Sequence, residues 1–259
     1  MAYTGETIDV DATLQRLNKA ASERGFDCFS LVEQDGTVVP YFTRAAKTES
    51  APRIYLSAGM HGDEPASPLS VLDLLENDLL GMGVDWTIFP MLNPAGFRIN
   101  QRENHQGVDL NREYKAPTTK EVKAHVEVIE QSEPWDLALI IHEDWESEGY
   151  YLYDLPTELT DGWAPRIIEA VSRVCPIDLS DSIDEMSAKG GIIAPRLEDI
   201  DTEPKLMGHW PEPIFMHAEG KIRGTYTFES PSSFDFTTRI QAHNAAILAS
   251  VELLLGSKR

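Results

Sequence analysis

Apolar positions along the chain follow two different periods, and together they predict an α/β protein. Unbroken apolar runs, typical of buried strands, occur at residues 54–56, 86–92, 135–141 and 225–228. Apolar residues spaced three or four positions apart, typical of helices with one buried face, occur at residues 8–25, 66–80, 119–132, 156–174 and 235–255. Strands without polar alternation, separated by helices, indicate a single-domain, mostly parallel or mixed twisted sheet with helices on both faces.

Three further segments complete the expected organisation. Residues 26–31 and 37–43 are predicted to be strands joined by a turn at Gln34-Asp35-Gly36, which indicates a hairpin. Residues 97–118 show no clear period, and a long irregular stretch inside a compact domain is usually functional. Residues 176–223 combine prolines, a glycine pair and scattered acids, so loops are expected there.

Polar residues follow the ends of three predicted strands. His61, Asn93 and His142 each lie just past the carboxyl end of an apolar run. Ligands of α/β folds bind at this end of the sheet. We therefore expect these three residues, which are distant in the chain, to meet at one edge of one sheet.

His61 and Glu64 lie on a strand-to-helix turn, where a loop can carry chemistry on a rigid scaffold. Gly59 and Gly62 allow the backbone to turn sharply, and Pro65 fits the first position of the following helix. An imidazole nitrogen and a carboxylate oxygen placed this way can reach the same metal ion. The pair is therefore a candidate for two ligands of a metal site.

A second His-x-x-Glu motif, His209-Trp210-Pro211-Glu212, provides an internal control for this pattern. It lies among prolines, with no predicted strand before it and no predicted helix after it, so it is predicted to be a loop. The His-x-x-Glu spacing alone therefore predicts little. The predicted strands and helices around each motif distinguish a metal-binding motif from a chance match.

The amino-acid composition indicates the class of protein, and its net charge excludes some classes of binding partner. The 259 residues are 42% hydrophobic and 25% charged, as in a soluble globular protein, and without internal repeats or boundaries we expect one domain over residues 1–259. The formal net charge of −21 argues against nucleic acid and anionic membranes as partners, because both would be repelled. A solvated acidic surface is the preferred interpretation of this charge, with a basic substrate or a saline habitat as alternatives.

Features that would direct the protein to another compartment are not evident in the sequence. The N-terminus has no basic region followed by an apolar run, so no signal peptide is predicted. No stretch approaches the roughly 20 apolar residues that span a bilayer. Cys28 and Cys175 form no metal-binding or redox motif. We therefore expect a cytoplasmic protein with two buried, reduced thiols.

Two histidines and one carboxylate form a usual ligand set of catalytic zinc, which leaves a fourth position open to water. His61, Glu64 and His142 would supply this set, so we expect one Zn²⁺ per chain. The chain contains in order the motifs His61-Gly-Asp-Glu64, Asn93-Pro-Ala-Gly96, Arg102, Gly107-Val-Asp-Leu-Asn-Arg112, His142 and Thr227-Phe-Glu229-Ser. This series, over about residues 53–231, resembles the carboxypeptidase A-type zinc metallopeptidases, in the broad sense that includes murein peptide amidases and the aspartoacylase and succinylglutamate desuccinylase group.

The resemblance implies a zinc carboxypeptidase-like fold and a role for each matching residue. It implies His61, Glu64 and His142 as the zinc ligands. It implies Glu229 as the general base, which would take a proton from the activated water and pass it to the leaving nitrogen.

Four other residues match family positions that handle the substrate or orient a ligand. Arg102 matches the arginine that stabilises the oxyanion of the tetrahedral intermediate. Asn111 and Arg112 match the pair that binds the terminal carboxylate of the substrate, a task suited to a planar guanidinium. Asp109 matches a carboxylate that accepts the other ring N–H of the first histidine ligand and fixes its tautomer.

Each assignment also has a structural alternative. Asn111 and Arg112 are compatible with a helix start or a salt bridge. His142 is compatible with a salt-bridged surface histidine, and Glu229 with a loop acid, since exposed acids are common in so acidic a chain. Arg102 has arginine neighbours, so its assignment depends on its spacing to Asn111.

The chain departs from the digestive members of the family in two places. No tyrosine occurs between Tyr153 and Tyr226, where those members carry a tyrosine on a mobile loop. The segment Glu143–Glu148 places four acids near the proposed zinc. A solvated loop is the preferred interpretation of these acids, with a basic group of the substrate or a second cation as alternatives. The segment that sets specificity in the family corresponds to residues 204–223, whose pattern indicates no preferred side chain.

The predicted function is a zinc-dependent hydrolase that cleaves a C-terminal peptide or amide bond next to a free carboxylate, in a peptide or murein-peptide fragment. One alternative is a deacylase of small N-acyl amino acids, similar to the aspartoacylase and succinylglutamate desuccinylase group. Another is a non-catalytic zinc- or peptide-binding module, against which Glu229 argues because binding alone needs no base. The expected partner is a peptide or acyl amino acid with a free carboxylate, and no oligomeric state is indicated.

Overall fold

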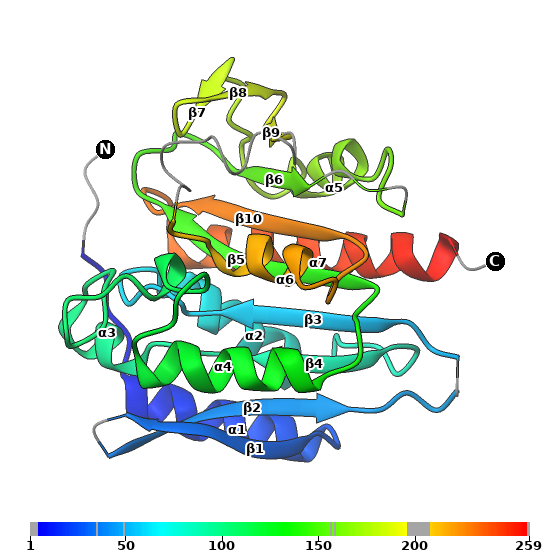
Figure 1. Cartoon of the computed structure of the whole chain (residues 1–259). Coiled ribbons are helices and arrows are strands. Elements are labelled where there is room, and N and C mark those ends of the chain that lie inside the picture. Colours follow the sequence, from blue (N-terminus) through cyan, green and yellow to red (C-terminus); the bar gives the residue numbers. More distant parts are fainter. Residues whose placement is uncertain are drawn as a thin grey trace.

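One mixed sheet runs through the computed structural model of the chain (Figure 1). The structure describes residues 5–34, 36–48, 50–155, 157, 159–195 and 208–257. Within these residues the sheet has ten strands in the order β1-β2-β4-β3-β5-β10-β6-β9-β8-β7. The strands are β1 (Asp27–Gln34), β2 (Thr37–Arg44), β3 (Arg53–Ala58), β4 (Asp85–Phe89), β5 (Leu137–Asp144), β6 (Tyr151–Leu155), β7 (Ser182–Ile183), β8 (Met186–Lys189), β9 (Ile192–Ile193) and β10 (Thr225–Pro231).

The centre of the sheet is parallel, and its flanks are mainly antiparallel. β5 pairs in parallel with β3 and with β10, and β3 pairs in parallel with β4. β2 is antiparallel to both β1 and β4, and β6 is antiparallel to β10. β5 is buried along almost its whole length, which explains its unalternated apolar sequence. The predicted α/β class with a mixed sheet, and the predicted hairpin of β1 and β2, are confirmed.

Helices cover both faces of this sheet. The described helices are α1 (Val10–Glu23), α2 (Ala66–Glu76), α3 (Pro94–Ile99), the 3₁₀ helix η1 (Leu110–Arg112), α4 (Lys120–Gln131), α5 (Ala164–Val171), α6 (Glu212–Ala218) and α7 (Phe236–Ser257). Successive residues of β3 alternate between two cores: Ile54 and Leu56 pack with α1, α2, α5 and α7, and Tyr55 packs with α4 and α6. Figure 1 shows α4 and α6 in front of the sheet and α2 and α7 behind it.

The helix predicted over residues 156–174 is shorter in the structure. Thr157 and Thr160 join their hydroxyls across a turn, and Gly162 adopts a φ of +73°, a left-handed conformation that does not continue a helix. α5 therefore begins at Ala164, while positions 156 and 158 lie outside the described residues.

The regions predicted without regular structure contain several short elements. Residues 97–118 include the end of α3 and all of η1. Residues 176–223 were expected to be loops, but they contain β7, β8, β9 and α6. Strands of two to four residues are too short to show a period in the sequence. Residues 196–207, which include part of the segment expected to set specificity, lie outside the described residues.

Two expectations drawn from composition can be compared with the structure. Cys175 is buried as expected, but Cys28 is exposed on β1 at the edge of the sheet, so the expectation of two buried thiols is wrong for Cys28. Among the helices of the described residues, none combines the length and the apolar character needed to cross a bilayer.

Candidate metal centre and active site

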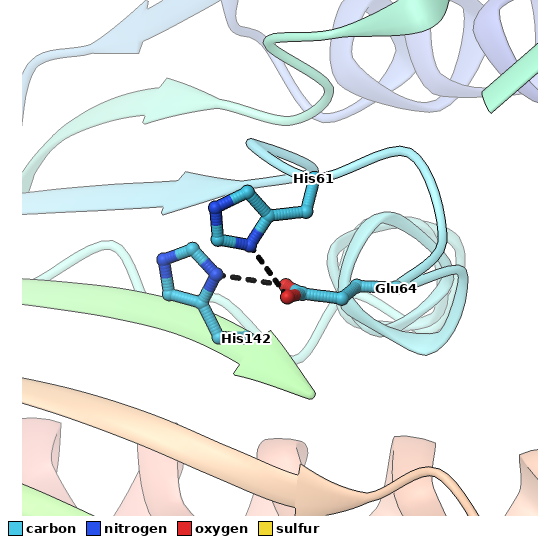
Figure 2. A group of neighbouring side chains, drawn as sticks. All are labelled: His61, Glu64 and His142. Atoms are coloured by element: carbon cyan, nitrogen blue, oxygen red, sulfur yellow. Dashed lines mark hydrogen bonds and ion pairs between the residues drawn. The ribbon is translucent and has the colours of Figure 1, made fainter. Parts of the chain in front are cut away.

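His61 and Glu64, which follow β3, converge with His142, which lies near the carboxyl end of β5. The parallel pairing of these strands sets Ala58 opposite Ile141, which brings the two following segments side by side. His61 Nδ1 lies 2.5 Å from one carboxylate oxygen of Glu64, and His142 Nδ1 lies 2.7 Å from the other. Figure 2 shows both rings facing that carboxylate. The predicted meeting of His61 and His142 at one sheet edge is confirmed, with ring centroids 4.7 Å apart.

The donor atoms of this cluster fit a zinc ion. One ligand atom from each residue lies within 4.8 Å of the others, and all three side chains are buried. Two imidazole nitrogens and one carboxylate are a usual set of protein ligands for catalytic zinc. Among the described residues, no other group of three histidines, cysteines or acids is placed this closely. His142 is therefore not the surface histidine of the structural alternative.

Two glycines allow the His61 turn to approach the loop after β4. A Cβ atom on Gly62 would overlap the backbone of Gly96, so only glycine fits at this contact. Asn93 joins the same two loops: its side-chain amide donates to the Met60 carbonyl (3.2 Å), and its side-chain oxygen accepts from the Gly96 N–H (2.9 Å). The predicted meeting of Asn93 with His61 thus follows from backbone packing and a cap at the start of α3.

Asp109 and Arg102 lie against the same cluster. Asp109 Oδ1 is 3.4 Å from His61 Nε2, the ring nitrogen that faces away from Glu64. Asp109 Oδ2 accepts from Arg102 Nε (2.9 Å), and Arg102 Nη1 lies 3.7 Å from the Glu64 carboxylate. Asp109 also caps η1 by accepting from the Asn111 N–H (2.9 Å). Asp109 therefore joins the first histidine, the arginine and η1 in one arrangement.

Asn111 and Arg112 are both part of η1, so the structural alternative of a helix start describes their backbone. The Asn111 side-chain oxygen accepts from the Glu212 N–H (3.0 Å), and its amide nitrogen lies 3.4 Å from His142 Nε2. Arg112 Nη1 donates to the Asn111 carbonyl (2.9 Å). Both side chains nevertheless line the cavity that contains the His61 cluster, as a substrate-binding role requires.

Glu229 lies on β10 directly opposite His142 of β5. It is part of a strand, not of a loop, and its half-buried side chain lines the cavity. Burial raises the pKa of Glu229 well above its ordinary value, the carboxylates of Glu64 and Asp144 raise it further, and Arg102 opposes the shift.

The histidines and the carboxylates of the cluster shift one another's pKa values. Burial alone would raise the pKa of Glu64, but His61 and His142 outweigh burial and lower it far below its ordinary value. Burial would likewise raise the pKa of Asp109, but contact with His61 and Arg102 lowers it strongly. Burial lowers the pKa of His142 despite the nearby Glu64. Ionised carboxylates and a neutral His142 are the protonation states in which these groups can bind a metal.

The cavity around the cluster has a volume of about 660 Å³ and is rich in acids. Arg102 and Arg112 are the only arginines or lysines among its described lining residues. The acidic residues that line it are Glu64, Asp109, Asp144, Glu146, Glu148, Asp178, Asp184 and Glu229, and Glu143, whose side chain is fully buried, also belongs to the lining. Two of the acids are held by tyrosines: Tyr151 donates to Asp144 (3.0 Å) and Tyr153 to Asp184 (2.7 Å).

The segment Glu143–Glu148 was expected to be a solvated loop, and this expectation is wrong for Glu143. Glu143 is the next-to-last residue of β5, and its side chain is buried against Arg239 of α7 (2.5 Å). Burial raises the pKa of Glu143 to about 7, and Arg239 acts in the opposite direction. Neither the buried ion pair nor the place of Arg239 was predicted, because the two residues are 96 positions apart in the chain.

Glu212, from the second His-x-x-Glu motif, is also buried and was predicted to lie in a loop. It begins α6, and its carboxylate accepts hydrogen bonds from the hydroxyls of Tyr55 and Ser57 (3.0 Å for Ser57). Burial raises the pKa of Glu212 to about 7, opposed by these two hydroxyls. His209 is exposed, so the two residues of this motif do not form a shared site.

Comparison with known proteins identifies relatives of the fold and of part of the sequence. Residues 50–154 match the family of the Succinylglutamate desuccinylase/Aspartoacylase catalytic domain. This range contains His61, Glu64 and His142. No curated protein matches the chain in sequence.

Three solved structures share the fold over nearly the whole chain. A candidate metallopeptidase from Shewanella amazonensis SB2B is 22% identical, with a TM-score of 0.80 over 95% of this chain and 93% of that protein. Another, from Shewanella baltica OS155, is 25% identical, with a TM-score of 0.77 over 95% and 92%. A metallo-carboxypeptidase from Pseudomonas aeruginosa, in complex with (2-guanidinoethylmercapto)succinic acid, is 15% identical, with a TM-score of 0.71 over 98% and 70%.

The fold, the family match over residues 50–154 and the convergence of the motif series support the predicted resemblance. The chain is similar to the carboxypeptidase-like proteins and to their aspartoacylase and desuccinylase relatives.

Proposed function

We propose that the protein is a zinc-dependent hydrolase that cleaves the amide bond next to a free carboxylate, at the C-terminus of a peptide. The observation that carries this proposal is the convergence of two histidines and a carboxylate in a cavity that also contains Glu229 and Arg102. Zinc at this position would polarise the substrate carbonyl and lower the pKa of a water molecule.

Glu229 and Arg102 are the proposed catalytic groups of the chain itself. The Glu229 carboxylate faces the cavity beside His142 and would take the proton of the attacking water, then deliver it to the leaving nitrogen. Arg102 is oriented by Asp109 and lies beside Glu64, where its guanidinium can stabilise the oxygen that becomes negative during attack. Asp109 would hold the His61 ring through Nε2, so that Nδ1 remains available to the metal.

Arg112 is the proposed recognition residue for the free carboxylate of the substrate. Arg102 is already committed to Asp109, so Arg112 is the second cation of the described cavity lining and the better candidate for a substrate anion. Asn111, held by the Glu212 N–H, would add its amide N–H. The Pseudomonas aeruginosa relative binds a succinic acid derivative, which also carries carboxylates.

The proposal is tested by turnover of short peptides with a free C-terminus, compared with the same peptides as C-terminal amides. We expect hydrolysis of the free peptides only, inhibition by a chelator and recovery with zinc. Glu229→Gln should retain zinc and lose turnover, and retained activity would remove Glu229 from the mechanism. Arg112→Ala should raise KM for free carboxylate substrates by roughly 10–100-fold, the effect of a lost charge-assisted hydrogen bond.

Deacylation of small N-acyl amino acids is the second candidate function, and the family match over residues 50–154 favours it. Both reactions break an amide next to a carboxylate and would use the same residues. The cavity volume of about 660 Å³ leaves room for more than one residue of a peptide, which is why peptide hydrolysis is placed first. Faster hydrolysis of N-acetyl- or N-succinyl-amino acids than of any short peptide would reverse this order.

A further inference from the structure

A buried ion pair lies on the reverse side of β5 from the proposed zinc site. Residues of a strand alternate between the two faces of the sheet. Alternation along β5 sets the His142 side chain toward the cavity and the Glu143 side chain toward the face of Leu139 and Ile141, where α2 and α7 pack, while Glu143 still forms part of the cavity lining. There it meets Arg239 of α7, and the side chains of both residues have no exposed surface.

Glu143 joins three elements through its two carboxylate oxygens. One oxygen accepts from the Ala66 N–H at the first residue of α2 (2.5 Å), and the other accepts from Arg239 Nη1 (2.5 Å). Arg239 Nη2 also contacts the carboxylate of Glu6. A negative charge at the N-terminus of α2 is favourable, because the first N–H groups of a helix have no partner within the helix.

These contacts fix a part of the site that the pairing of strands does not fix, namely the position of Glu64 relative to His142. The ladder between β3 and β5 ends at the pairing of Ala58 with Ile141. From Gly59 onward the chain leaves the sheet, so strand pairing does not fix the position of Glu64 relative to His142. The bond from Ala66 to Glu143 does so, because its donor is two residues after Glu64 and its acceptor is one residue after His142.

We propose that Glu143 and Arg239 are positioning residues that hold Glu64 at the correct distance from His142, and that they thereby set the zinc affinity of the site. This inference rests on the zinc site of the proposed function. Arg239 acts through Glu143, because its Nη1 holds one oxygen of the carboxylate whose other oxygen accepts from the Ala66 N–H. Without Arg239 the Glu143 side chain is free to turn away from Ala66, and the turn that carries Glu64 becomes looser.

A second contact between the same two helices provides a matched control. Asn244 of α7 accepts from the Ser70 hydroxyl (2.7 Å) and donates to Asp73 (2.7 Å), farther along α2 and away from the ligands. Asn244→Ala removes a buried polar link between α2 and α7 without touching Glu143. It therefore reports what loosening this helix pair does by itself.

The experiment measures the zinc dissociation constant by chelator competition for the wild type and for Arg239→Met, Glu143→Gln and Asn244→Ala. Thermal unfolding of the zinc-free proteins is measured in parallel. We expect Arg239→Met and Glu143→Gln to weaken zinc binding by roughly 10–100-fold, the usual effect of residues that orient a metal ligand. Asn244→Ala should bind zinc like the wild type, even if its zinc-free unfolding temperature falls as much as that of the other two variants.

Two further readouts separate positioning from general stability. The visible spectrum of the Co²⁺-substituted protein should change in Arg239→Met and Glu143→Gln and stay unchanged in Asn244→Ala. Arg239→Lys keeps a positive charge but not the guanidinium that reaches both Glu143 and Glu6, so it should recover only part of the zinc affinity lost in Arg239→Met.

The possible failures are distinguishable. If the wild type binds zinc and both positioning variants bind it equally tightly, this inference is overturned and the proposed function stands. Equal weakening in Asn244→Ala would also overturn it, because any loosening of α2 against α7 would then suffice. A wild type that binds no zinc would overturn the proposed function itself and this inference with it.

Discussion

The two His-x-x-Glu motifs of this chain have the same spacing but differ in the burial of the histidine and in the groups that surround the glutamate. His61 and Glu64 lie between β3 and α2, with both side chains buried and facing His142. In the second motif His209 is exposed, while Glu212 is buried against the hydroxyls of Tyr55 and Ser57. Both glutamates are buried carboxyl groups, yet one faces nitrogen ligands at a sheet edge and the other faces hydroxyl donors inside a core. The partners from other strands, not the spacing, distinguish a metal site from a structural acid.

Replacing each glutamate by glutamine should separate the two motifs most strongly. Glu64→Gln removes the negative ligand between the two histidines, so zinc affinity should fall by more than roughly 100-fold, beyond the loss seen for residues that only orient a ligand. Glu212→Gln should retain one zinc per chain. Zinc titration of both variants provides the measurement, and comparable zinc loss in the two would contradict the distinction.

The turn of the first motif should depend strongly on glycine. Gly62→Ala adds a Cβ that overlaps the backbone of Gly96, so the free energy of unfolding should fall by about 1–3 kcal/mol, as for other overpacked sites. Because the overlap displaces the loop between His61 and Glu64, zinc binding should weaken too. Gly256→Ala is the control, since its Cβ meets no atom within 4 Å. Denaturant unfolding and zinc titration of both variants check this prediction.

The buried glutamate of the second motif, Glu212, should make the free energy of unfolding depend on pH. Burial raises the pKa of Glu212 from 4.5 to about 7 in the folded protein, so between these values the folded state binds more protons than the unfolded state. The contribution of Glu212 to stability is therefore fully present below about pH 4.5 and is lost as the pH rises to about 7, by up to about 3 kcal/mol.

The difference in unfolding free energy between the wild type and Glu212→Gln isolates this contribution, since glutamine keeps the size and does not titrate. We expect the wild type to lose stability relative to the variant as the pH rises from 4.5 to 7. A constant difference over that range would mean that Glu212 does not titrate there. Glu143 shifts in the same direction but is present in both proteins and cancels.

The smallest effect is expected at the exposed histidine of the second motif. His209→Ala removes a side chain with no role in either buried arrangement, so stability should change by less than about 0.5 kcal/mol, as for most surface substitutions. Zinc content and turnover should match the wild type. A clear loss of zinc in this variant would mean that the second motif contributes to zinc binding, and it would contradict the distinction between the two motifs.

The sequence predicted those parts of the molecule whose signal is local. The apolar run of β5 and the helix α4 both appear where predicted, since each is encoded by adjacent residues. The His61, Asn93 and His142 positions were predicted to meet because each follows a strand, and the carboxyl ends of parallel strands share one sheet edge.

The parts that escaped prediction depend on partners far away in the chain. Glu143 looked like one of several solvated acids, and nothing near it indicates Arg239, 96 residues later, as its partner. Glu212 looked like a loop residue between prolines, because Pro213 is compatible both with a loop and with the first turn of α6. In both cases a charged residue is buried by tertiary contacts that leave no periodic pattern in the sequence.

The most direct test of the account is the zinc content of the purified protein by elemental analysis, measured on the wild type, His142→Ala and His209→Ala. His142 comes from a different strand than His61 and Glu64, so its loss tests whether the three residues share one ion. We predict about one zinc per chain in the wild type and in His209→Ala, as for a single catalytic site, and almost none in His142→Ala. Zinc that persists in His142→Ala, or a wild type without zinc, would contradict the central claim.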